Sequence, residues 1–408
     1  MTGVGGRRFT PILAVLLVAA LAALGVLAGT QATGLLGPGR GAAPAATHAS
    51  PGSATSGAPA SAAAGLAGAT PSPVHSPTPA PRVESVVDGV LVPAAQSVKA
   101  TRVPIAVMID DHPDARPQSG LSSADLVYQA PAEGGIPRYM AVFQSGDAKA
   151  IGPIRSARRY FAGWAAEWRA LYAHVGGAPN ALAWVRGAGA SLVTDADEYS
   201  WASYMPRIAT RVAPHNVYSS TTQLRKLASR LDAKGGIADA PWTFGDETPE
   251  ALRPYGGTLT VSYPYNLVGY RYDRTTNRYP RTVSGGTPDV DAANGKRIAP
   301  ANVIVQYVEV GALANAPGQT TNEFKGRLEL GYIGSGKALV LCNGKVYQAR
   351  WSKVSDEAPT LFTYAKGSRA GQPVALVRGQ VYIQVVPLDA PVKAVAGHST
   401  PAPAGLAR

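Results

Sequence analysis

The residues that could support chemistry in this chain are concentrated around one arginine-rich stretch. Residues 151–161 read Ile-Gly-Pro-Ile-Arg-Ser-Ala-Arg-Arg-Tyr-Phe, which predicts a loop that leads into a helix. Ser156 is the expected N-cap, because its hydroxyl can accept a hydrogen bond from a free amide of the first turn. A helix N-terminus carries partial positive charge, so Arg155, Arg158 and Arg159 require a negative partner there. That partner is either an anionic ligand or the carboxylates of the chain itself.

A glycine-rich turn is the second feature that favours an anion site. Gly176 and Gly177 follow a predicted strand and precede a predicted helix, so their amides can face an oxyanion. Such strand-to-helix junctions are where α/β sheets place ligands. The residues that we expect to bind the ligand are Arg116, Glu133, Arg138, Arg155, Ser156, Arg158, Arg159, Gly176, Gly177 and Asn216.

The same arginines have a structural interpretation. Asp110, Asp111, Asp125 and Glu133 precede the arginine-rich stretch and can neutralise it as an ion-pair network. The discriminating observation is spatial. An open pocket that holds both these arginines and the acidic and imidazole side chains described next favours an enzyme, whereas burial of the arginines against carboxylates without a cavity favours the structural role.

Acidic and imidazole side chains offer a second kind of chemistry. Asp110, Asp111 and His112 follow a predicted buried strand, His174 ends another, and His215 lies in a loop. Carboxylates and imidazoles bind divalent metals and serve as general acids and bases. Asp110, Asp111, His174 and His215 are therefore the predicted catalytic residues. None of them has the spacing of a HExxH motif, so no metal ligands are assigned and the cofactor is unknown.

Composition limits the class of partner. The 408-residue chain has a formal charge of +12, from 38 Lys+Arg against 26 Asp+Glu, and 46% hydrophobic residues. No run of basic residues interleaved with aromatic ones is present, so we expect no nucleic-acid partner. Anionic lipid or wall polymer fits the charge. Cys342 is the only cysteine, which excludes an internal disulfide, and it is expected to lie at the end of a hairpin.

Residues 1–32 have the pattern of a membrane anchor. Arg7 and Arg8 precede an apolar run over residues 9–28, which is long enough to span a bilayer as a helix. Basic residues before the run and none just after it place the N-terminus in the cytoplasm and the remainder outside. We expect a single-pass protein of the cell membrane with extracytoplasmic domains, or a secreted protein if the helix is cleaved.

The next segment and the C-terminal end are expected to be disordered. Residues 41–80 contain no Asp, Glu, Lys or Arg and consist largely of Ala, Pro, Ser, Gly and Thr, so residues 33–100 are interpreted as a linker. Residues 391–408 are interpreted as a tail for the same compositional reason.

Two folded parts are expected between the linker and the tail. Residues 101–243 mix buried strands with helices, which predicts an α/β (or α+β) domain with a mixed sheet. Residues 244–390 consist of strand-like runs separated by turn signals, which predicts a mostly antiparallel β domain. Asn343-Gly344 is the best hairpin signal in the chain.

Several of these segments together resemble the YerB-like lipoprotein family. In the first half the similar segments are Pro104–His112, Arg116–Leu121, Ala130–Gly135, Ile151–Phe161, His174–Gly177 and Ala213–Asn216. In the second half they are Asn302–Tyr307, Gly334–Ala338, Asn343–Lys345, Trp351 and Ile383–Pro387. The resemblance covers residues 103–387 and implies a bacterial extracytoplasmic protein with two halves and a domain of unknown function. This chain has no lipobox cysteine, so its anchor would be the helix itself.

These observations together predict an anchored envelope protein that binds an anionic envelope ligand, such as a cell-wall polymer or its precursor, in its first domain. The alternative is a metal-dependent hydrolase or phosphotransferase that acts on cell-wall polymer precursors in the same cleft. The sequence leaves open whether the protein is an enzyme.

Overall fold

The computed structural model describes residues 80–237, 240–314 and 326–400. The predicted anchor at residues 1–32 and the predicted linker up to residue 79 lie outside the described residues. Within them, no helix has both the length and the apolar character needed to cross a membrane.

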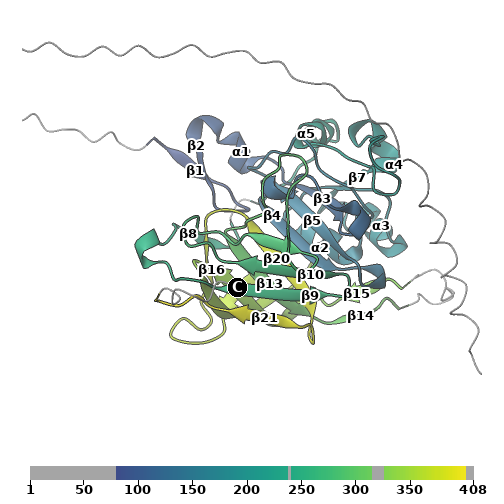
Figure 1. The fold of residues 1–408 in the computed structure, drawn as a ribbon. Helices are drawn as coiled ribbons and strands as arrows, with labels where there is room; N and C mark the ends of the chain where they lie inside the picture. The colour runs from purple at the N-terminus through teal and green to yellow at the C-terminus, as the bar shows by residue number, and fades with distance from the viewer. Residues whose placement is uncertain (1–79, 238–239, 315–325, 401–408) are drawn as a thin grey trace, which may run out of the picture. The chain divides into compact units, whose positions relative to one another are not determined.

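A ten-stranded mixed sheet forms the centre of the fold (Figure 1). Its strands, from one edge to the other, are β18 (Leu361–Tyr364), β17 (Lys345–Lys353), β16 (Gly334–Cys342), β13 (Asn302–Val308), β20 (Val381–Pro387), β4 (Leu126–Pro131), β5 (Pro137–Phe143), β3 (Ile105–Asp110), β6 (Leu171–His174) and β7 (Thr194–Asp197). β13, β20 and β4 run parallel to one another, and so do β3, β6 and β7. β5 is antiparallel to both β3 and β4, and β16 is antiparallel to β13.

Smaller sheets and short helices complete the described structure. The five-stranded antiparallel sheet is β12 (Thr287–Pro288), β11 (Arg281–Val283), β10 (Asn266–Arg271), β9 (Thr258–Tyr263) and β21 (Val392–Val395). The two-stranded pairs are β1 (Arg82–Glu84) with β2 (Leu91–Pro93), β14 (Val310–Ala312) with β15 (Leu328–Leu330), and β8 (Thr243–Gly245) with β19 (Ala375–Val377). The helices are α1 (Val98–Thr101), α2 (Arg159–Ala166), α3 (Pro179–Arg186), α4 (Glu198–Trp201) and α5 (Thr221–Arg230).

Both faces of the central sheet are buried at β3, which explains the continuous apolar run of this strand. Met108 faces a core shared with Trp164 of α2. Its neighbour Val107 faces a second core, shared with Leu224 of α5 and with Val261 of the five-stranded sheet. Successive residues of a strand point to opposite faces, so an apolar residue is needed at every position.

The expected combination of a mixed sheet with antiparallel sheets is confirmed, but the division of strands between the halves differs. β13 and β20, from the half predicted to be mostly antiparallel, are parallel to each other, and β20 pairs directly with β4 of the first half. One sheet therefore contains strands from both sides of the domain boundary that was predicted between residues 243 and 244. The Asn343-Gly344 hairpin is confirmed, because Cys342 of β16 pairs with Lys345 of β17.

Two predictions of disorder are wrong for the described residues. Residues 80–100 contain β1, β2 and α1, and Val87 is fully buried. At the other end, β21 adds an antiparallel strand to β9. The compositional argument came from residues 41–80 and does not extend to residue 87, where an apolar side chain enters the core.

Candidate functional site

The end of β3 brings together three of the predicted site residues. Asp110 is the last residue of the strand, and its Oδ2 lies 2.9 Å from Nδ1 of His215 and 2.9 Å from Nε of Arg155. The contact with Arg155 is an ion pair without the alignment of a hydrogen bond, since the buried Nε of Arg155 has no hydrogen-bond partner among the described residues. Asp110 is buried, whereas the side chains of Arg155 and His215 are 23% and 15% exposed. The cluster therefore opens to solvent on the side of these two residues.

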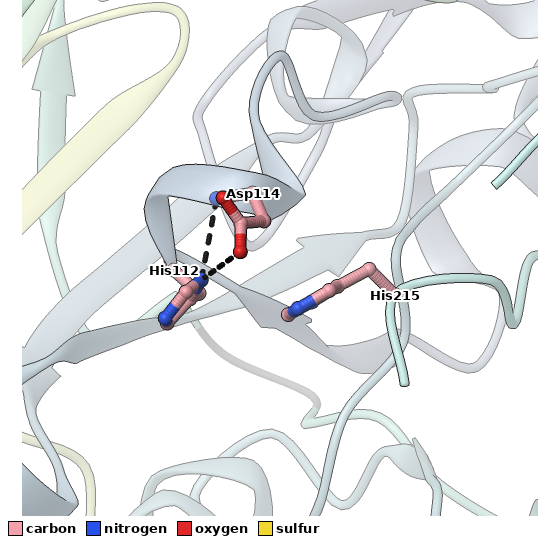
Figure 2. A group of neighbouring side chains, drawn as sticks. All are labelled: His112, Asp114 and His215. Atoms are coloured by element: carbon pink, nitrogen blue, oxygen red, sulfur yellow. Dashed lines mark hydrogen bonds and ion pairs between the residues drawn. The ribbon is translucent and has the colours of Figure 1, made fainter. Parts of the chain in front are cut away.

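His112 and Asp114 extend this cluster toward the surface. Figure 2 shows that the carboxylate of Asp114 points to the ring of His112, while the ring of His215 faces the same space from another loop. Nδ1 of His112 accepts a hydrogen bond from the amide of Asp114 at 3.2 Å, and the two imidazole rings stack with centroids 5.2 Å apart. A surface hollow of about 570 Å³ is lined by Asp114 and by residues 210–215. We refer to His112, Asp114 and His215 as the His–Asp–His cluster.

Asp111 faces away from this cluster into the protein. Its carboxylate is fully buried and contacts Nε of Arg116 at 3.0 Å, Nε2 of Gln129 at 2.7 Å and Nδ2 of Asn266 at 3.0 Å. Burial raises the pKa of Asp111, against the opposing effect of Arg116 and Arg281. The hydrogen bond between Asp111 and Asn266 therefore joins the end of β3 to the β9–β10 hairpin.

Glu133 forms ion pairs with two of the predicted ligand-binding arginines. Its side chain pairs with Arg158 and lies 3.4 Å from Nη1 of Arg138. Burial together with repulsion from Arg158 lowers the pKa of Arg138 to about 10. Burial works against ionisation of Glu133, but the two guanidiniums outweigh it and hold the pKa of Glu133 below its ordinary value. Arg138 and Arg158 are thus neutralised by a carboxylate of the chain, as the structural interpretation of the arginines predicted.

Arg159 points to the second half of the chain. Its Nη2 lies 2.7 Å from Oδ2 of Asp356, its Nη1 donates to the hydroxyl of Tyr332 at 2.6 Å, and the guanidinium stacks over Trp184 at 4.1 Å. The N-cap of α2 is Arg158, with no side-chain cap, so Ser156 does not cap the helix as expected. Ser156 lies before the helix because the extended backbone continues to Arg158, whose φ is −132°.

The Gly176–Gly177 turn is held by acidic side chains. The amide of Gly176 donates to Oδ1 of Asp197 at 2.8 Å and its carbonyl lies 2.8 Å from Nδ1 of His174. His174 is fully buried, and its Nε2 contacts Asp195 at 2.8 Å. The amide that was expected to face an oxyanion is therefore occupied by a carboxylate of the chain.

The predicted residues thus divide among several contact groups. Asp110, Arg155 and His215 meet, and Asn216, the neighbour of His215, accepts a hydrogen bond from Arg207 at 3.2 Å. The backbone oxygen of Ser156 accepts from Arg138 at 3.5 Å, and residue Gly177 forms a bridge with Ala157. The catalytic and ligand-binding roles of these residues stay predictions. Asp114 was missed, although its position two residues after His112 in a proline turn was a usable signal.

A basic groove in the second half was also missed. A hollow of about 580 Å³ lies over β13, β16 and β17 and is lined by Lys337, Arg350 and Lys366, with Tyr307 beside them and no carboxylate among its lining residues. Lys337 and Arg350 stand directly opposite each other in the register of β16 and β17. We refer to Lys337, Arg350, Lys366 and Tyr307 as the basic groove. Lys337, Arg350 and Lys366 come from separate segments of the chain, so their spacing in the sequence gave no signal for the groove.

Two parts of the chain match the two domains of one known protein family. Residues 92–234 match the N-terminal domain, and residues 259–383 the C-terminal domain, of a family described as "Protein of unknown function (DUF3048)". The chain belongs to this family, and the resemblance seen in the sequence is confirmed.

One relative and one solved structure agree with this assignment. The chain is 31% identical over 296 residues to "Putative lipoprotein YerB" of Bacillus subtilis (strain 168), which covers 71% of this chain and 83% of the relative. It is also similar to the crystal structure of the YerB protein from Bacillus subtilis, with a TM-score of 0.62 and 28% identity over 76% of this chain and 99% of that one.

Proposed function

We propose that this chain is an extracytoplasmic protein of the cell envelope, held at the membrane by residues 9–28, which binds an anionic envelope polymer. Its relative's printed description as a lipoprotein supports a location at the membrane. The apolar run after Arg7 and Arg8 supplies an anchor of sufficient length. The formal charge of +12 favours an anionic partner.

The basic groove carries this proposal. Lys337 and Arg350 are like charges directly opposite each other on neighbouring strands, an arrangement that destabilises a sheet unless an anion lies between them. Lys366 adds a third cation to the same hollow. An anionic group in the groove relieves this repulsion and gains charge-assisted hydrogen bonds.

The ligand class follows from the groove's chemistry. Several cations along an open hollow suit a polymer with repeated phosphate or carboxylate groups better than a single small anion. Tyr307 offers an aromatic surface on which a sugar ring can pack. A phosphate-bearing glycan of the cell wall combines both features.

This proposal places the ligand in the second half, whereas the sequence favoured the arginines of the first half. Arg155 and Arg158 each already contact a carboxylate, and so does Arg159. An anion there would compete with Asp110, Glu133 or Asp356, while in the basic groove it would meet no acidic side chain among the lining residues.

Charge reversal in the groove tests the proposal. The full-length chain is titrated with a soluble glycerol-phosphate polymer, with neutral dextran as the comparison polymer. Loss of about 1 kcal/mol for each reversed charge predicts that Lys337→Glu/Arg350→Glu binds roughly 10- to 30-fold more weakly. The affinity of the wild type should also fall as salt is raised.

A matched variant separates a site from general charge attraction. Lys226→Glu/Lys393→Glu changes the net charge by the same amount at two exposed positions outside the groove. It should retain most of the wild-type affinity. Equal weakening in both variants, or none in the groove variant, would contradict the proposal, and loss on Arg155→Ala alone would return the site to the first half.

A metal-dependent hydrolase or phosphotransferase is the second candidate function. The hydrogen bond from His215 to Asp110 resembles a histidine held by a carboxylate, as in many general bases. The other two predicted catalytic residues make different contacts: Asp111 pairs with Arg116, and His174 is buried against Asp195.

A further inference from the structure

We propose that the His–Asp–His cluster is a binding site for a divalent transition metal, with Zn²⁺ as the best-matched ion. The cluster joins two separate segments of the chain. His112 and Asp114 belong to the turn after β3, and His215 lies in a loop about a hundred residues later. The fold, rather than a local motif, makes the site.

The spacing of the three side chains fits one ion. One potential ligand atom from each residue lies within 4.8 Å of those of the other two. Atoms bound to one tetrahedral zinc at bonds of about 2.0–2.2 Å are about 3.4 Å apart, so only a small closing movement is required. The side chains of His112 and Asp114 are 36% and 76% exposed, so solvent rather than packed core surrounds that movement, and ligation through Nδ1 of His112 would replace its hydrogen bond with the amide of Asp114.

The histidine that is more buried is already oriented for coordination. Nδ1 of His215 is 2.9 Å from Oδ2 of Asp110, and in the neutral tautomer that donates from Nδ1 to this carboxylate, Nε2 has its lone pair available for a metal. Ligating histidines commonly donate their other ring nitrogen to a carboxylate in this way, which fixes the tautomer and raises ligand basicity. Asp110 is itself buried at the end of β3 and holds His215 from a rigid strand.

The donor set selects the class of ion. Two imidazoles and one carboxylate match the three protein ligands of an open zinc site, with a fourth position left for water or a ligand. Ca²⁺ and Mg²⁺ prefer a shell of oxygen atoms, which these residues do not provide. The hollow of about 570 Å³ beside Asp114 and His215 gives access to that fourth position.

Nearby charges neither attract nor exclude a cation strongly. Arg155 pairs with Asp110, and Arg211 donates to the backbone oxygen of Asp114 at 3.3 Å. These two positive charges balance the carboxylates of Asp110 and Asp114. Affinity for the ion must therefore come from direct ligation, and replacing a ligand should remove most of it.

Zinc binding by the tag-free full-length chain tests the proposal. Isothermal titration with Zn²⁺ should give one site, and His112→Ala/His215→Ala should abolish that site. Asp110→Asn should weaken binding by about 10- to 100-fold, as expected when a carboxylate behind a ligating histidine is lost. Co²⁺ added in place of Zn²⁺ should produce visible absorption bands of a tetrahedral site in the wild type and not in the double variant.

The control is a histidine that lies outside the cluster. His398 is exposed and its Nδ1 contacts the carbonyl of Thr400, so His398→Ala should bind Zn²⁺ like the wild type. Circular dichroism of each variant checks that the fold is intact, and His112→Ala, at a partly exposed position, serves if the double variant misfolds. Absence of Zn²⁺ binding by the wild type, or unchanged binding by the folded variants that lack His112, would overturn the proposal.

Discussion

At the scale of single residues, one fully buried ion pair links the two halves of the chain. Glu167, at the end of α2, and Lys353, at the end of β17, are both fully buried and lie 3.0 Å apart. Glu167 also accepts hydrogen bonds from the amide and hydroxyl of Thr360, each at 2.8 Å. An ion pair of this kind gains little over apolar packing, but losing one partner leaves a buried charge uncompensated.

We therefore expect Lys353→Met to lower the free energy of unfolding by about 3–5 kcal/mol, because it leaves Glu167 charged and without its cation. Urea unfolding followed by circular dichroism measures the change. Lys353→Met/Glu167→Gln should be less destabilised than Lys353→Met alone. Lys393→Met, which removes an exposed lysine, should lie within about 0.5 kcal/mol of the wild type. A loss below 1 kcal/mol for Lys353→Met would mean that solvent reaches this pair.

At the scale of elements, α2 is fixed at both ends by the second half. Its N-terminal turn lacks a side-chain cap, and its first residue, Arg159, pairs with Asp356. Burial disfavours the charged form of Asp356, but hydrogen bonds from Arg159 and Tyr332 outweigh burial and lower the pKa of Asp356. A carboxyl whose pKa is lowered in the folded state stabilises the protein at pH values above the pKa that it has in the unfolded chain, which is near 4. This stabilisation is lost as the pH falls through the pKa of the folded state.

The expected consequence is a pH-dependent cost for Asp356→Asn. At pH 7 the variant should be less stable than the wild type by about 1–2 kcal/mol, since the pair is partly exposed to solvent. Below pH 3 the two proteins should converge, because Asp356 of the wild type is then increasingly protonated. Denaturant unfolding at both pH values provides the measurement. A difference that stays constant between pH 7 and pH 3 would show that the ionised carboxylate is not responsible.

At the scale of the whole described structure, the two family segments share one sheet. β20 lies between β13 and β4, so a strand of the second segment is hydrogen-bonded to one of the first (Figure 1). The Glu167–Lys353 and Arg159–Asp356 pairs cross between the same segments. Separating the halves would expose the edges of both strands and leave buried charges without partners.

We expect the full-length chain to unfold in a single calorimetric transition, with a calorimetric enthalpy close to the van't Hoff enthalpy. Fragments 80–243 and 244–400, made separately, should fail to reach the native circular dichroism spectrum and should regain it when they are expressed together. Two resolved transitions, or independent folding of either fragment, would favour the predicted boundary between residues 243 and 244 as a true domain boundary.

The sequence by itself determined the family, the buried strands and the β16–β17 hairpin. These depend on local signals: apolar runs such as residues 105–109, and an Asn-Gly turn in which both residues adopt positive φ. The sequence also singled out Arg155, because it precedes a predicted helix N-terminus, and Asp110 and His215, because carboxylates and imidazoles can ligate a metal or act as acids and bases. The sequence did not show which residues these side chains contact, because an ion pair between distant segments leaves no local sequence motif.

Only the tertiary structure decided which charges meet and which stay free. The order of strands in the central sheet puts β20 beside β4 and brings Asp356 to Arg159, so an arginine that seemed to need a ligand has an internal partner. The same folding sets Lys337 opposite Arg350 and His215 beside His112. Contacts between distant segments depend on the packing of the whole sheet, and for that reason the sites proposed here could not be read from residue spacing alone.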